Sequence, residues 1–531
     1  MAYDTKRLTR DAKNLAWLVV ALVTGVVIGW LPQTQAALAV AGAIFFVAAL
    51  LRPHLALYAL VFSVPYETLK QVELGGLAVS STEVLVALLL AAWLARVAAR
   101  LERPRPVPLL IPVLILLWVY GLSLLQAANT TLALKEAAKW AEVAAVLLVT
   151  AHALTNRRRV AFLLLCMFAA GWVQSGLGAY QFFRQVGPES FAFGSYLRAH
   201  GTFGQPNALG GYLGLILPLA VSMALLLGPL LVEWWHRRTK SPTQTSEPGP
   251  CLPVPCLLAL ALAGAASVAV LGAGLVMSYS RGAWLAFAAA ALTVWGLQGR
   301  CAFAVILILA LVTIIALPLG ITDLLPSFVT ARLGSIAESM ALFDARVVLV
   351  TDENFSTVQR MAFWQTALAM WEDHPWVGVG PGNYPVAYAR YHVHPAFPEP
   401  LAGHPHNVYL QLLAEVGILG LAAYLLLLAW ALAAALRALY RLPSHACFWR
   451  AVTSGVIGVF VAVVVHTLFD NLYVHGMNVY VGLALGLIAA VPAVLPRGIE
   501  SDSGLIRADD DHGTSNCFHA FSSCAEPGLV S

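Results

Sequence analysis

Charged side chains are scarce in this chain of 531 residues, of which 11% are charged and 60% are hydrophobic. A soluble domain carries about a quarter charged residues, so too few remain here to cover a water-facing surface. Apolar stretches of about 20 residues recur along the whole chain instead, and each is long enough to cross a bilayer as a helix. The composition therefore excludes a soluble globular protein.

Alternating polar and apolar segments, which a membrane β-barrel would need, are also missing. Unbroken runs of Leu, Ala, Val and Ile indicate an all-α polytopic membrane protein with about 12–14 transmembrane helices. The predicted spans are 15–31, 35–51, 54–64, 80–99, 108–126, 134–153, 160–183, 207–232, 256–278, 283–298, 301–319, 406–436, 451–470 and 478–495.

Lys and Arg are rare between the spans except in every second connection. The basic connections hold Lys6, Arg7, Arg10 and Lys13; Arg52; Arg96, Arg100, Arg103 and Arg105; Arg157, Arg158 and Arg159; Arg237, Arg238 and Lys240; Arg300; and Arg437, Arg441 and Arg450. Because such connections face the cytoplasm, we expect both termini to be cytoplasmic. The long segment 321–405 then lies outside.

Five regions follow from this reading. We expect N-terminal transmembrane helices over 1–199, further transmembrane helices over 200–320, an external loop over 321–405, C-terminal transmembrane helices over 406–495 and a disordered cytoplasmic tail over 496–531. A Pro/Ser/Thr-rich linker occupies 236–255. The external loop is rich in Trp, Phe and Tyr, and its stretch VQRMAFWQTALAMWEDHP has apolar residues at helical spacing. We expect it to form helices on the membrane surface above the bundle.

The chain also lacks nucleotide and metal motifs. No P-loop is present, and the glycines Gly378, Gly380 and Gly382 do not follow a strand. No cysteine falls in the external loop, and no zinc spacing occurs. We expect no cofactor, no metal and no nucleic-acid partner. A large external loop without a nucleotide fold favours a substrate that arrives from the membrane itself, such as a lipid-linked group.

A polar cluster lies where the external loop re-enters the membrane, in GHPHNVYLQLLAEVGILG. A half-desolvated His406 tends to stay neutral and able to accept a proton, as a general base for a hydroxyl must. His404 and Asn407 are candidate substrate-binding residues beside it. The alternative is that His406 and Asn407 cap a helix whose Gly417 and Gly420 serve close packing.

Two arginines strengthen the functional interpretation. Arg281 falls on a short external turn between two apolar spans, where a cation is costly without an anionic partner. Arg360 lies on the predicted loop helix. Guanidinium groups bind phosphates in a bidentate manner, so the two arginines and His406 together fit a diphosphate and an activated hydroxyl. The alternatives are snorkelling of Arg281 to lipid phosphates and a solvated face for Arg360.

Polar residues also stand at two other external ends. Gln205 and Asn207, in GTFGQPNALGGYL, are candidate sugar-binding residues, although packing alone explains the neighbouring glycines. His466 and Asp470 lie one turn apart on another span, followed by Asn471 and His475. A structural polar network is the simpler interpretation of those four.

These motifs resemble the superfamily of O-antigen ligases and O-antigen polymerases, bacterial envelope glycosyltransferases. The ligase signature, H-[NSQ] followed after nine residues by G-x-x-G, is matched by His406-Asn407 and by Gly417 with Gly420. GTFGQPNALGGYL, SRGAW at 280–284 and Arg360 ahead of P-W-x-G-x-G-x-G-N-Y look like further motifs of the family, with Gln205 where Asn is common. The similarity covers roughly 200–480.

The resemblance implies a GT-C-like membrane fold in the bacterial inner membrane and an undecaprenyl-diphosphate-linked glycan as donor, with no metal. By carry-over, Arg281 and Arg360 would hold the diphosphate and His406 would activate the acceptor hydroxyl. The acceptor stays open between lipid A-core and a growing glycan, that is, between ligase and polymerase. Different classes of function are also open: a transporter of lipid-linked sugars, or a non-catalytic assembly protein.

Overall fold

The computed structural model describes residues 33–67, 71–74, 77–194, 196–226, 254–299, 343–351, 354–399, 403–443 and 446–494. The predicted spans 15–31 and 301–319, nearly all of the linker 236–255, the first part of the external loop and the predicted tail 496–531 lie outside the described residues.

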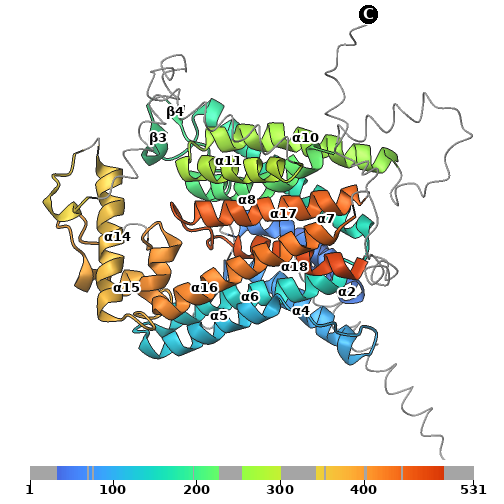
Figure 1. The fold of residues 1–531 in the computed structure, drawn as a ribbon, viewed down its shortest axis with the longest axis horizontal. Helices are drawn as coiled ribbons and strands as arrows, with labels where there is room; N and C mark the ends of the chain where they lie inside the picture. The colour runs from blue at the N-terminus through green and yellow to red at the C-terminus, as the bar shows by residue number, and fades with distance from the viewer. Residues whose placement is uncertain are drawn as a thin grey trace, which may run out of the picture.

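Long helices run side by side through the described chain and form one bundle (Figure 1). Its first half consists of α2 (Gln33–Leu51), α3 (Pro53–Ser63), α4 (Ser81–Ala98), α5 (Leu110–Ser123), α6 (Thr130–Ala153) and α7 (Arg157–Arg184). Its second half consists of α8 (Pro206–Ala224), α10 (Val254–Met277), α11 (Arg281–Gly296), α16 (Val408–Arg441), α17 (Cys447–His466) and α18 (Asn478–Val494). The predicted external loop contributes α14 (Phe355–Asp373) and α15 (Tyr384–Tyr391).

Six helices within the described residues are long and apolar enough to cross a membrane: Ser81–Ala98, Arg157–Arg184, Pro206–Ala224, Pro255–Met277, Val408–Arg441 and Cys447–His466. The fold is therefore the helical polytopic membrane fold that was predicted. The other predicted spans within the described residues are also helices, but α3 and α11 have only 11 and 16 residues. The helix α6 is long enough, with 24 residues, but is not among the six because it carries the charged residues Lys135, Glu136, Lys139 and Glu142.

Two short antiparallel strand pairs stand in the connections and were not predicted. β1 (Gln71–Leu74) pairs with β2 (Leu77–Ser80), with Gln71 opposite Ser80. β3 (Ala192–Phe193) pairs with β4 (Tyr196–Leu197). Ser80 then caps α4, since its hydroxyl accepts a hydrogen bond from Glu83 N at 3.2 Å while the Glu83 carboxylate accepts from Ser80 N.

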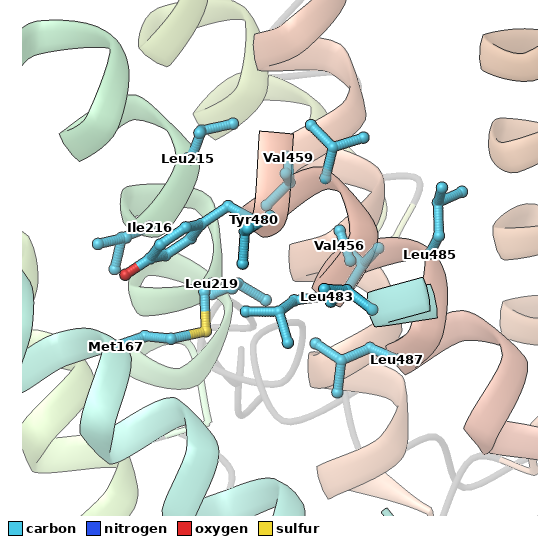
Figure 2. Packing of buried hydrophobic residues seen from close by; sticks show 14 of the residues in the cluster. Met167, Leu215, Ile216, Leu219, Val456, Val459, Tyr480, Leu483, Leu485 and Leu487 are labelled. Carbon is cyan, nitrogen blue, oxygen red and sulfur yellow. The ribbon is translucent and has the colours of Figure 1, made fainter. Parts of the chain in front are cut away.

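The centre of the bundle is α8, whose spanning window is 83% buried and which packs against α7, α10, α11 and α17. Figure 2 shows Leu215 and Leu219 of α8 in one cluster with Val459 of α17 and Tyr480 of α18. The Tyr480 hydroxyl lies 3.0 Å from that of Tyr212, so this buried polar pair is satisfied. Close packing of this kind holds helices together in lipid, where hydrophobic burial supplies little.

The two ends of the bundle differ. One end carries α14, which lies across the bundle rather than along it, together with α15 (Figure 1). The turns before α8, α11, α16 and α18 gather at this end, so these four helices begin here and present their partly positive N-termini to it. The arrangement brings together the motifs that contain Asn207, Arg281 and His406, which are far apart in the sequence.

Candidate functional site

A break in α16 accommodates the loop segment that follows α14. Gly417 has a non-helical backbone (φ 71°, ψ −169°), and a side chain on it would come within 2.3 Å of the Trp376 backbone. The hydrogen bonds missing from the helix are made to the loop instead: Ile418 N donates to Pro375 O, and Val379 N donates to Ala414 O, both at 2.9 Å. The Gly-rich turn after α14 is thus a docking element, and Gly417 is required by this close approach.

His406 and Asp470 form the polar pair at the centre of the site. Nδ1 of His406 lies 2.9 Å from Oδ1 of Asp470, and the two side chains retain 17% and 13% of their exposure. Burial alone would raise the pKa of Asp470, but the adjacent His406, by its charge and hydrogen bond, holds that pKa well below its usual range. Because an ionised carboxylate can only accept, Nδ1 of His406 must be the donor. In the neutral imidazole, Nε2 then carries the lone pair and is free to take a proton.

His404 supports this pair from the preceding turn. Its Nδ1 accepts a hydrogen bond from His406 N at 3.2 Å. Burial, followed by the neighbouring His406, lowers the pKa of His404 to about 4, so the ring is neutral near pH 7. His406 itself has a left-handed backbone with φ 55°. The hydrogen bond from its backbone N–H helps to hold that uncommon conformation.

The same three side chains have the spacing of a possible metal site. Single ligand atoms of His404, His406 and Asp470 all lie within 4.8 Å of one another, and imidazole nitrogen with carboxylate oxygen is a common ligand set for zinc. However, Nδ1 of each histidine is already engaged, one by Asp470 and the other by the His406 backbone. Each ring still has Nε2, the nitrogen that a histidine held by a carboxylate or backbone group can offer to a metal ion, so the hydrogen bonds fit an oriented base and a metal centre alike.

Arg360 lies on α14, which packs against His406 through Phe363. Phe363, one turn further along this helix, is fully buried, and its ring lies nearly parallel to that of His406 with the centroids 6.4 Å apart. Residues three apart share a helix face, so Arg360 projects from the same side of α14 as Phe363. Its half-buried guanidinium makes no hydrogen bond or ion pair with any of the described residues.

Arg281 is the first residue of α11 and is half-buried. The start of this helix lies against the segment that carries Asp470, because a side chain on Gly282 would come within 2.7 Å of the Phe469 Cβ atom. A cation is unfavourable at a helix N-terminus unless an anion is bound there, since both carry positive charge. An anion bound at the start of α11 would complement both positive charges.

An arginine that was not predicted joins this turn to the GTFGQPN segment. Nε of Arg198 donates to Ser278 O at 2.9 Å, and Nη2 donates to Oδ1 of Asn207 at 2.7 Å. Asn207 thus holds Arg198, while Gln205 is exposed at the N-cap of α8 and makes no side-chain cap. The sequence did hold a sign of this residue, because Arg198 lies in a connection predicted to be external, where arginines are rare.

Asn407 and Asn471 are both buried and hydrogen-bonded beside the His406–Asp470 pair. Asn407 is buried and caps α16, with its Oδ1 accepting from Leu410 N at 3.1 Å. Asn471 N donates to Oδ1 of Asp470, and Asn471 Nδ2 donates to Oε1 of Gln411. The network interpretation holds for Asn471, but Asp470 also contacts His406. Sequence reasoning missed that contact because the two residues lie 64 positions apart.

The geometry brings the three predicted catalytic positions to one end of the bundle. Arg360 stands one turn from Phe363, Phe363 stacks on His406, and His406 binds Asp470. Phe469, the residue before Asp470, contacts the glycine that follows Arg281. An imidazole–carboxylate pair and two arginines therefore lie at one end of the helical bundle.

Comparison with known proteins finds a family match over part of the chain. Residues 266–425 match a family model described as O-antigen ligase, so the chain carries an O-antigen ligase domain in a multi-pass membrane protein. The matched stretch includes Arg281, Arg360 and His406, whereas Asn207 and Asp470 lie outside it. Comparison with curated proteins found no match.

Proposed function

We propose that the chain transfers a glycan from an undecaprenyl-diphosphate-linked donor to an acceptor hydroxyl at the outer face of the bacterial inner membrane. The observation that carries the proposal is the His406–Asp470 pair, against which α11 with Arg281 and α14 with Arg360 are packed. The family match agrees with a ligase or polymerase activity.

The proposed reaction is a displacement at the anomeric carbon. Nε2 of His406 takes the proton of the acceptor hydroxyl while the hydroxyl oxygen forms the new bond to the anomeric carbon. The bond from that carbon to the diphosphate oxygen breaks, and its electron pair leaves with the diphosphate. Asp470 keeps His406 in the required tautomer and stabilises the imidazolium that forms.

Arg281 and Arg360 would bind the diphosphate and stabilise its charge as it leaves. Each guanidinium can donate two parallel hydrogen bonds to phosphate oxygens. Preorganised donors of this kind act most strongly where charge develops, and each is worth about 10²–10³-fold in rate in well-studied enzymes. Helices α11 and α16 also have their N-termini at this site, and their partial positive charge adds to the attraction for the diphosphate.

A pair of alanine variants tests the mechanism. We expect His406→Ala and Arg281→Ala to insert and fold normally but to lose glycan transfer, measured as surface polysaccharide in a deletion strain complemented with each variant. Exposed residues at the same end provide matched controls, His392→Ala and Arg184→Ala, which should restore the polysaccharide. Normal polysaccharide with His406→Ala or Arg281→Ala would remove the mechanism.

The acceptor is identified by what accumulates in the deletion strain. Mass analysis of lipid-linked glycans should show long chains if the acceptor is lipid A-core, and single repeat units if the acceptor is a growing glycan. Uptake of lipid-linked sugar into reconstituted vesicles, without covalent transfer, would instead identify a transporter.

A chelator separates the oriented base from a metal centre at His404, His406 and Asp470. If His406 acts through its hydrogen bond to Asp470, EDTA should leave the transfer rate of the purified protein unchanged. Loss of activity with EDTA, restored by a divalent ion, would show that the three side chains hold a metal.

A further inference from the structure

A second charged site lies at the opposite end of the bundle. Its cavity, of about 450 Å³, is formed where α2, α4 and α6 end and α3 and α7 begin. The helix α6 runs from the α14 end to this cavity, and its 24 residues span about 36 Å at the usual rise per residue. Figure 1 likewise places α2 and α4 away from α14. The cavity is therefore separate from the His406 site.

Guanidinium groups dominate the lining of this cavity. Five arginines face it, Arg52, Arg96, Arg103, Arg105 and Arg159, against the single carboxylate of Glu102. The ring of His152 adds no charge, because its Nε2 accepts from Arg105 N while its Nδ1 lies 2.7 Å from Leu148 O. Five positive groups and one negative group leave four positive charges without a carboxylate in the cavity wall.

Most of these arginines are held by neutral acceptors. Arg96 Nη1 donates to Leu51 O, Arg105 Nη2 donates to Ala151 O, and Arg159 Nη1 donates to Ala153 O. These carbonyls orient the guanidinium groups without neutralising them, and of the three only Arg96 also pairs with Glu102, through Nε at 3.2 Å, among the contacts described. The side chains of Arg52 and Arg103 are exposed and make no hydrogen bond or ion pair with any described residue. An anion is the complement that this wall lacks.

The apolar surroundings place the cavity at a membrane surface. Leu51 and Leu101 line it and are 66% and 69% exposed, and Leu94 of α4 is 50% exposed nearby. A charged wall beside exposed leucines matches a lipid whose headgroup enters the cavity while its acyl chains follow the helices. Positive-inside topology explains why arginines occur at this end, but it does not explain their convergence on one cavity.

We infer that this cavity binds a phosphate group, presented at the membrane surface by an anionic phospholipid. The shared chemistry of a lipid phosphate and free phosphate is the charge and oxygen geometry that guanidinium groups recognise. The inference is independent of the proposed transferase activity, because it concerns the other end of the bundle and is read out by binding alone.

The test compares two double variants of the full chain in detergent. Arg52→Gln/Arg103→Gln removes two cavity charges that hold nothing else, whereas Arg437→Gln/Arg441→Gln removes two exposed charges at the end of α16, outside the cavity. Dioleoyl phosphatidylglycerol, dioleoyl phosphatidylcholine and inorganic phosphate serve as probes, with bound lipid counted by native mass spectrometry and phosphate measured by calorimetry.

We expect phosphatidylglycerol to bind the parent chain and the α16 variant equally, and the cavity variant about thirtyfold more weakly. If inorganic phosphate binds and is weakened by the Arg52 and Arg103 substitutions in the same way, but no lipid binds, the site belongs to a soluble phosphate group. The inference would be overturned if both double variants lost phosphatidylglycerol binding equally, if the parent chain bound phosphatidylcholine as tightly as phosphatidylglycerol, or if no probe bound. If the double variant changes the thermal midpoint, the single variants Arg52→Gln and Arg103→Gln should each show about a fivefold loss.

Discussion

Two of the five left-handed backbones of non-glycine residues in the described part of the chain lie at or next to residues that the proposed reaction uses. His406 and Tyr279 both have left-handed backbones, with φ 55° and 51°, and Tyr279 stands two residues before Arg281. For a residue with a side chain this conformation costs about 1–3 kcal/mol and persists only where surrounding contacts impose it. In this structure the two strained residues lie where the chain orients the His406 ring and where it turns into α11, so the strain lies at the candidate site.

The proposed tautomer of His406 can be tested at Asp470. Asp470→Asn keeps the size of the side chain, but its amide can donate to Nδ1 of His406 and so place the proton on Nε2. We expect the transfer rate to fall by about 10²–10⁴-fold, because the base then has no lone pair towards the acceptor. Asp344→Asn, at an exposed position, is the control. A parental rate with Asp470→Asn would exclude Asp470 from orienting the base.

The fork geometry gives a test at Arg360. Arg360→Lys keeps the charge but loses the paired donors, and we expect transfer to slow by at least about tenfold with little change in thermal midpoint. Arg346→Lys is the matched control, since Arg346 is exposed on the same loop and contacts only Asp344 at 3.8 Å among the charged groups described. Full activity with Arg360→Lys would place Arg360 on a solvated face.

A buried carboxyl outside the spans sets an expected pH dependence. Burial, followed by the charges of Glu142 and Glu83, raises the pKa of Glu67 to about 7 from 4.5. Between these values the folded state keeps a proton that the unfolded state has lost, so stability falls as the pH rises, by at most about 1.4 kcal/mol per pH unit. The thermal midpoint of Glu67→Gln should lack this part of the slope between about pH 4.5 and 7. A slope identical to that of the parent would exclude Glu67 as its source.

At the scale of elements, the broken helix α16 connects the two halves of the candidate site. It carries Asn407 at its start and accepts the loop after α14 at Gly417, so one helix positions both His406 and the helix that bears Arg360. The proposed activity therefore depends on the docking of the loop, although the docking residues take no part in the chemistry.

Gly417→Ala tests the docking. The added methyl group would meet the Trp376 backbone at 2.3 Å and would force a positive φ on alanine. We expect a loss of about 1–3 kcal/mol in stability, faster proteolysis within residues 354–399 and loss of transfer. Gly214→Ala in α8 is the control, because nothing lies within 4 Å of its added Cβ. Unchanged proteolysis with Gly417→Ala would show that the break does not hold the loop.

At the scale of the whole molecule, the prediction concerns orientation. If the α14 end faces away from the cytoplasm, a membrane-impermeant maleimide should label Leu349→Cys in intact cells but not Thr155→Cys, which stands at the opposite end. The parent chain should stay unlabelled, because its cysteines are predicted to lie within spans or on the cytoplasmic side. Labelling of Thr155→Cys alone would invert the topology.

Much of the architecture could be predicted because apolar runs translate directly into helices. α7, α10 and α17 begin and end within a few residues of the predicted spans. The signature residues His406, Asn407, Gly417 and Gly420 could be found because they lie in one short segment. The strand pairs were missed because four- and two-residue strands leave no periodic pattern to detect.

The sequence by itself determined the membrane class, the positions of the helices and the candidate residues on each of them, because hydropathy and short motifs are local properties. Only the tertiary structure decided that Asp470 contacts His406, that Arg198 binds Asn207 and that the Gly-rich turn fills the break in α16. Those partners are distant in the chain, and their meeting depends on which helices pack together, which no local pattern encodes.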